Sequence, residues 1–141
     1  MRRWWSFLIP ILLVMLPIVS ACADEEAAPS TTGAATSCQD AFSWDAAYKH
    51  VGERATVRGP VMSPRYASDS PDQPTFLDMG RPDPDPDRFT VVIWGEDRGN
   101  FPEPPEQAYD GKTICVTGVI ETDEGRPLII ADSPSDIEIA E

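Results

Sequence analysis

The chain has 141 residues, with 11 lysines and arginines against 24 aspartates and glutamates, and a formal net charge of −13. This length accommodates about one domain. An acidic chain repels polyanions, and phosphate backbones are bound mainly through lysine and arginine. The composition therefore argues against nucleic acid as a partner.

The N-terminal segment has the three parts of an export signal. Two arginines precede a long apolar run, which ends in small residues. A permanent transmembrane helix is the alternative, because about 20 apolar residues can span a bilayer. Pro10 and Pro17 interrupt the run, however, and no basic cluster follows it. We expect residues 1–21 to be a signal peptide.

The exit from this run, Val19-Ser20-Ala21-Cys22, resembles the lipobox of bacterial lipoproteins. The resemblance implies cleavage before Cys22 and attachment of palmitate-like acyl chains to its thiol and new amino group. Several acyl chains, at about 0.8 kcal/mol per buried methylene, anchor a protein stably. The implied location is the extracytoplasmic face of the cell membrane. Ordinary cleavage after an A-x-A-like site fits less well, because a cysteine stands at the wrong place.

The segment after Cys22 predicts a flexible spacer. Residues 23–37 are all Ala, Ser, Thr, Gly, Pro or acids, and such a composition cannot bury enough apolar surface to order itself. We therefore expect an anchor and spacer over residues 22–37 and one folded domain over residues 38–141. Without residues 1–21, nine basic side chains face 24 acidic ones, for a net charge of −15.

The start of this domain predicts a short amphipathic helix. Trp44, Ala47, Tyr48 and Val51 recur at the i, i+3, i+4 and i+7 spacing of one helical stripe. A single further helical turn is expected after Pro105, inside an otherwise Pro-rich segment.

The rest of the domain alternates with period two, which predicts strands. Five strands are expected, over residues 53–63, 74–80, 88–95, 112–122 and 126–132. Residues 135–140 alternate again, and either extend the fifth strand or close an edge of the sheet.

A short helix followed by five strands, with glycines inside the first and fourth, indicates a small β-barrel. The segments HVGERATVRGPV, TFLDMG, RFTVVIWGED, YDGKTICVTGVI and GRPLIIADSPSDIEI resemble the oligonucleotide/oligosaccharide-binding (OB) fold. The expected fold is therefore mainly β, a five-stranded OB-like β-barrel with a short N-terminal helix. The Pro-rich segment, where this fold usually has a longer helix, is a departure from the pattern.

Two cysteines remain besides the lipidated one. Outside the cytoplasm two cysteines in a small domain usually pair, so Cys38 and Cys115 are expected to form a disulfide. Cys115 lies in phase opposite to Ile114 and Val116 and should point away from the barrel interior. Two unpaired buried thiols are the alternative.

The OB resemblance also implies a ligand face. In this fold, aromatic side chains on the second and third strands stack on bases or sugars, and cations meet phosphate. For Trp94, packing against the helix or the spacer is the alternative. The candidate residues are Trp94, Arg58, Arg65, Tyr66, Arg88 and Arg98.

An acidic stretch between the second and third expected strands invites a calcium interpretation. Asp83, Asp85 and Asp87 alternate with prolines. An EF-hand loop would need Gly at position 88 and Glu at position 94, where this chain has arginine and tryptophan. A solvated acidic loop is the preferred interpretation, with weak calcium binding as the alternative.

No catalytic motif is recognisable in the sequence, and the chain has one histidine. We expect no enzyme activity and no cofactor. The predicted function is a membrane-anchored lipoprotein whose barrel is a non-catalytic binding module for an envelope protein or a glycan. A nucleic-acid-binding protein and an acidic calcium-binding module are the alternative functions.

Overall fold

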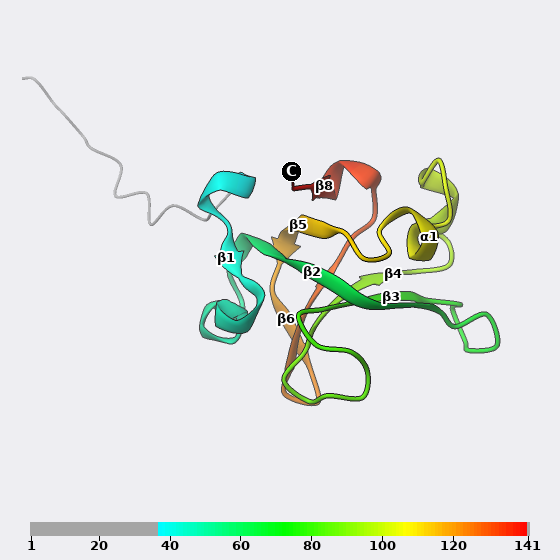
Figure 1. Ribbon diagram of the computed structural model, residues 1–141. Coiled ribbons are helices and arrows are strands. Elements are labelled where there is room, and N and C mark those ends of the chain that lie inside the picture. The colour runs from blue at the N-terminus through cyan, green and yellow to red at the C-terminus, as the bar shows by residue number, and fades with distance from the viewer. Residues whose placement is uncertain (1–36, 141) are drawn as a thin grey trace, which may run out of the picture.

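The computed structural model describes residues 37–140 (Figure 1). The predicted signal peptide, Cys22 and nearly all of the spacer lie outside the described residues. Among the residues described, none of the helices has both the length and the apolar character needed to cross a bilayer.

Strands dominate the described domain, as predicted, but they form one open sheet of eight strands and not a closed barrel of five. The sheet order is β6-β7-β4-β3-β2-β5-β8, with the short β1 paired in parallel to β2. The strands are β1 (Phe42–Ser43), β2 (Arg54–Tyr66), β3 (Thr75–Met79), β4 (Phe89–Ile93), β5 (Thr113–Val119), β6 (Glu121–Asp123), β7 (Arg126–Ile130) and β8 (Ile137–Ile139).

Two local features explain the difference from the expected barrel. The fourth expected strand breaks at Ile120, which is fully buried and bonds to the backbone of Gly52 and Glu53, so that β5 and β6 become separate strands. β5 and β7 then approach without pairing. A side chain at Gly118 would meet Ile129 at 2.5 Å, so glycine at this position lets the two strands pack closely.

The predicted N-terminal helix is present as a 3₁₀ helix, Trp44–His50. Such a helix has three residues per turn, so that residues three apart share a face. Trp44 and Ala47 therefore pack on the core, as predicted. Tyr48 and Val51 turn outward and are 61% and 44% exposed, which makes the four-residue apolar stripe wrong at these two positions.

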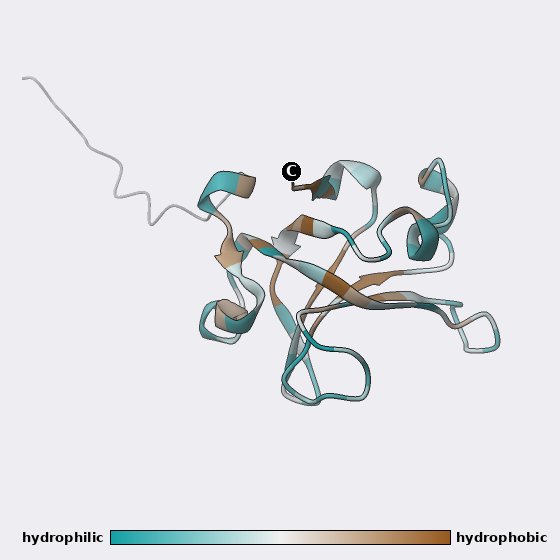
Figure 2. Cartoon of the chain, in the orientation of Figure 1, coloured by the Kyte–Doolittle hydropathy of each residue, from teal (hydrophilic) through white to brown (hydrophobic). Residues whose placement is uncertain are grey.

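The core lies between the inward faces of the strands, where period-two alternation predicted it. Figure 2 shows apolar colour along the strands and hydrophilic colour over most loops. The fully buried apolar side chains of the central strands are Ala55, Val57, Val61, Leu77, Met79, Phe89, Val91, Ile93, Ile114, Val116 and Ile129. The single helical turn expected after Pro105 is confirmed as α1 (Pro105–Ala108), and residues 137–139 close the sheet edge beside β5.

The disulfide between Cys38 and Cys115 is confirmed. Cys115 lies on β5, on the face opposite to the core residues Ile114 and Val116, yet it is 2% exposed. The short 3₁₀ helix Cys38–Asp40 lies next to this face of the sheet through the bond. The bond thus fastens the first described segment to an interior strand of the sheet.

Candidate functional site

A groove of about 500 Å³ lies on the outer face of β3, β4 and β7. Leu77, Val91 and Ile129 are buried on the core side of the sheet. Because side chains alternate along a strand, their neighbours lie on the outer face, where the groove is. Strand register aligns Phe76, Val92 and Ile130 in one row. These three apolar side chains line the groove, and Phe76 and Ile130 are partly exposed in it.

A second, polar row adjoins the apolar one. In it Asp78 pairs in register with Thr90. The Oδ1 atom of Asp78 accepts hydrogen bonds from Arg88 Nε (3.1 Å) and Thr90 Oγ1 (2.8 Å). Arg88 also pairs with Asp83 at 2.8 Å and donates to the Asp85 carbonyl at 2.6 Å. Arg88 is thus fixed by three acceptors and is 8% exposed.

Asp78 is an unusual group for a sheet interior. It is 1% exposed, and its Oδ2 atom has no hydrogen-bond partner among the described residues. Burial raises the pKa of this carboxyl, although the hydrogen bond from Thr90 and the charge of Arg88 act in the opposite direction. A buried carboxylate oxygen without a donor is energetically unfavourable.

The rim of the groove carries further charges. The Arg65 guanidinium is stacked over the Phe76 ring, 4.7 Å from its centroid, and is exposed. At the opposite rim Arg126 pairs with Glu124 at 2.8 Å and with Asp123 at 3.4 Å. The β6–β7 hairpin and the loop between β3 and β4 project from the same end of the sheet (Figure 1).

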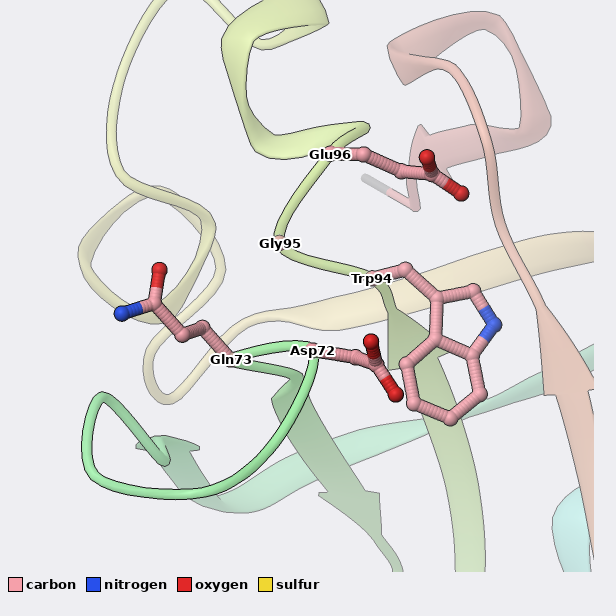
Figure 3. A pocket seen from close by; sticks show the side chains of 5 residues that line it. All are labelled: Asp72, Gln73, Trp94, Gly95 and Glu96. Carbon is pink, nitrogen blue, oxygen red and sulfur yellow. The ribbon is translucent and has the colours of Figure 1, made fainter.

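Trp94 separates the groove from a second pocket, of about 540 Å³. Figure 3 shows the carboxylate of Asp72 beside the indole ring, with Glu96 on the other side of the pocket. The Gly95 N–H donates to the Asp72 carbonyl at 2.8 Å. A side chain at Gly95 would meet that carbonyl at 2.6 Å, so glycine lets the loop before β3 close on the end of β4.

The structure brings together three of the six predicted ligand-face residues, Arg65, Arg88 and Trp94, which all line the groove. Arg88 is held by its acidic partners, so Arg65 and Trp94 are the accessible pair. Trp94 lies between the groove and a second pocket, and the spacer, against which it was alternatively expected to pack, lies outside the described residues.

The other candidates lie elsewhere. The Arg98 guanidinium stacks on Tyr66 at 3.6 Å, pairs with Glu106 at 2.8 Å and donates to Thr75. These bonds from Arg98 lower the pKa of Glu106, and they give Arg98 and Tyr66 a structural role next to α1. Arg58 lies in a separate shallow pocket beside Cys38.

The acidic loop between β3 and β4 does not gather its carboxylates. Asp83 pairs with Arg88, Asp85 pairs with Arg81 at 3.3 Å, and the Asp87 N–H donates to Asp85 Oδ1. Within residues 37–140, no group of three or more His, Cys, Asp or Glu side chains is placed to hold a metal ion. The calcium interpretation therefore gains no support from the geometry.

Sequence reasoning missed Phe76, Asp78, Asp72 and Glu96. A signal for Asp78 was present, because an acid in the middle of the apolar strand TFLDMG needs a buried partner or a ligand. No sequence signal placed Asp72 and Glu96 beside Trp94, since the loop closure that brings them there is tertiary.

Comparison with known proteins gives distant structural likenesses. No protein-family model and no curated protein sequence matches the chain. Among solved structures, it is similar to a "putative aspartyl-tRNA synthetase" from Leishmania major Friedlin, with a TM-score of 0.44, 9% identity and coverage of 70% of this chain. It spans 20% of that protein. It is also similar to a "putative nucleic acid-binding lipoprotein" from Klebsiella pneumoniae, with a TM-score of 0.43, 13% identity and coverage of 70% of this chain and 78% of that one. Both likenesses are too distant to indicate a function.

Proposed function

We propose that this chain is a lipid-anchored extracytoplasmic protein whose β-domain binds a partner through the groove over β3, β4 and β7, without catalysis. The observation that carries the proposal is the apolar row of Phe76, Val92 and Ile130, partly exposed at Phe76 and Ile130, next to the buried Arg88–Asp78 pair. Concave apolar surfaces with a few convergent polar groups are the usual form of binding sites.

The chemistry of the groove favours binding over catalysis. A group that acts as a general base must be accessible and close to the substrate. The Asp78 carboxylate is buried and accepts hydrogen bonds from Arg88 and Thr90. His50, the single histidine of the chain, stacks on Phe42 and pairs with Glu53. It does not line the groove.

The anchor rests on the sequence Val19-Ser20-Ala21-Cys22. We expect Cys22→Ser to abolish fatty-acid labelling and to leave the protein uncleaved or released from the membrane, because serine lacks the thiol that accepts the acyl chain. The measurement is metabolic labelling with a clickable fatty acid, followed by membrane fractionation. The matched control is Cys38→Ser, which should keep its label. Full labelling of Cys22→Ser contradicts the anchor.

The binding groove is tested by site-specific photocross-linking in cells that produce the chain. Arg65 and Arg58 are both exposed arginines on β2, but Arg65 lines the groove and Arg58 lies beside Cys38. A photoreactive amino acid at position 65 is expected to give a discrete adduct, and the same group at position 58 is not. Equal adducts at both positions, or none at position 65, would contradict the proposed groove.

A further inference from the structure

We propose that the groove and the adjoining Trp94 pocket hold an extended basic segment of a partner protein, with basic side chains at positions i and i+4 and an apolar side chain at i+2. This inference rests on the proposed binding function and specifies the chemistry of the partner. The supporting observations are the spacing of the side chains along β4, the unpaired oxygen of Asp78 and the acids around Trp94.

The spacing comes from β4 and the residue that follows it. Thr90, Val92 and Trp94 all line the groove and alternate along the chain. Alternate residues of a strand are about 6.7 Å apart, so the two ends of this series are separated by about 13 Å. An extended peptide that runs alongside has the same repeat. Its residues i, i+2 and i+4 therefore face Thr90, Val92 and Trp94 in turn.

At the first position the groove offers an acceptor within an ion-pair cluster that has one acid in excess, although the groove lining as a whole holds three arginines and three acids. Arg88 carries one positive charge against the carboxylates of Asp78 and Asp83, which both pair with it. The Oδ2 atom of Asp78 has no donor among the described residues. A lysine ammonium supplies both the missing donor and the missing charge. Since Oδ2 is covered in this structure, a small movement of the groove wall must accompany binding.

The middle position, which faces residue i+2 of the peptide, is formed by apolar side chains from three strands. Phe76, Val92 and Ile130 form one row across β3, β4 and β7, and the Arg65 guanidinium lies over the Phe76 end of this row. A leucine side chain, or the methylene stem of a long side chain, gains by leaving water on this surface. A polyamine has only an unbranched methylene stem to place here and a leucine side chain is branched, so the row favours a peptide.

The second cationic position is the Trp94 pocket. Indole is the best aromatic partner for a cation, and the carboxylates of Asp72 and Glu96 flank the ring (Figure 3). Neither acid forms an ion pair within residues 37–140. The excess of acids over bases, with a net charge of −13 for the whole chain, also attracts a basic segment and repels a nucleic acid.

The experiment uses the full chain in a neutral detergent and a fluorescent nine-residue peptide, with lysines at positions 3 and 7, leucine at position 5 and glycine or serine elsewhere. Anisotropy should report a Kd on the order of 10–100 µM that weakens with added salt. The control peptide has the same composition with the lysines at positions 3 and 4. We expect it to bind about tenfold more weakly or not at all.

Two groove variants and one matched control locate the binding. Asp78→Asn replaces Oδ2 by an amide donor, and Asp72→Asn with Glu96→Gln neutralises the exposed acids at Trp94. Each variant should raise the Kd for the peptide by about tenfold or more. The control, Asp110→Asn with Glu138→Gln, neutralises two exposed acids elsewhere and should change the Kd less than twofold. Melting curves establish whether each variant is folded. If Asp78→Asn is not folded, the variant with Asp72→Asn and Glu96→Gln still tests the inference.

Several results would overturn this inference. Equal binding of the two peptides excludes the proposed spacing, and unchanged binding by the Asp72/Glu96 variant excludes the Trp94 position. Tighter, groove-dependent binding of spermidine, a neutral oligosaccharide or a labelled single-stranded oligonucleotide rejects the basic segment but leaves the proposed groove intact. Failure of every probe, together with no cross-link at position 65, rejects the inference and the proposed function alike.

Discussion

Reduction of the Cys38–Cys115 disulfide is expected to lower the melting temperature of the domain by at least about 10 °C. The bond joins residues 77 positions apart. Closing a loop of this size in the unfolded chain corresponds to roughly 4.5 kcal/mol on the chain-entropy model, and loss of a native disulfide from a small domain typically costs about 2–5 kcal/mol. Each 1 kcal/mol shifts the melting temperature of a domain of about 100 residues by roughly 4–8 °C.

The measurement is calorimetry of the full chain in detergent, with and without a phosphine reductant. The variant Cys38→Ala/Cys115→Ala should melt close to the reduced protein, and reductant should leave its melting temperature unchanged. That variant separates the effect of the bond from any effect of the reductant. Titration of two free thiols from Cys38 and Cys115 in the native, unreduced protein would rule the bond out.

The place of the disulfide indicates which part of the domain loosens first. Cys115 lies on β5, between β2 and β8, whereas Cys38 precedes the two-residue β1. Without the bond, this first segment is held by the pairing of β1 with β2 and by the packing of Phe42 against the core. Amide exchange after reduction should therefore rise in residues 38–43 before it rises in the central strands.

The period-two pattern predicted the long strands well, because each of them buries one face. β2, β3, β4, β5 and β7 lie within or close to the expected ranges, and in β2, β4 and β5 alternate apolar residues are buried in the core. β1 and β6 have two and three residues, too few for a recognisable alternation. The open sheet was not predictable either, since it depends on how β5 meets β7 in space.

The alternation of side chains along a strand also explains why the predicted ligand face was only partly right. Neighbours on a strand point to opposite faces, so Arg65 and Tyr66 could not both enter the groove. Arg58 and Arg65 are seven positions apart and would point to opposite faces of a regular strand. A register shift between Val61 and Ser63 changes the phase of β2 and places Arg65 on the groove face beside Phe76, whereas Arg58 lies in the part of β2 that pairs with β5, away from the groove. Such an irregularity depends on the pairing of β2 with β3 and leaves no clear mark in the sequence.

Gly80→Ala is expected to destabilise the domain by roughly 2–5 kcal/mol. Gly80 has a φ of +75°, a conformation that costs a residue with a side chain about 1–2 kcal/mol. A methyl group there would also overlap Cε2 and Cδ2 of Trp44. The indole ring must move, and overpacking of this kind adds about 1–3 kcal/mol.

Gly111→Ala is the matched control, because Gly111 has a φ of +67° and no atom within 4 Å of the position of a new methyl group. It carries the conformational cost alone, about 1–2 kcal/mol. Urea denaturation of the two variants therefore measures the contact with Trp44 by difference. Equal destabilisation would show that the ring moves aside without loss of stability.

A double-mutant cycle completes the test of this contact. Trp44→Leu removes the indole ring, which also packs against Gly59, where a new methyl group would lie 2.8 Å from Cδ1. In the Trp44→Leu background, Gly80→Ala should cost no more than Gly111→Ala, so that the two changes couple by about 1–3 kcal/mol. Because Gly80 directly follows β3 and its N–H donates to the Pro60 carbonyl at 2.8 Å, an uncoupled loss would instead place the strain in the backbone between β2 and β3.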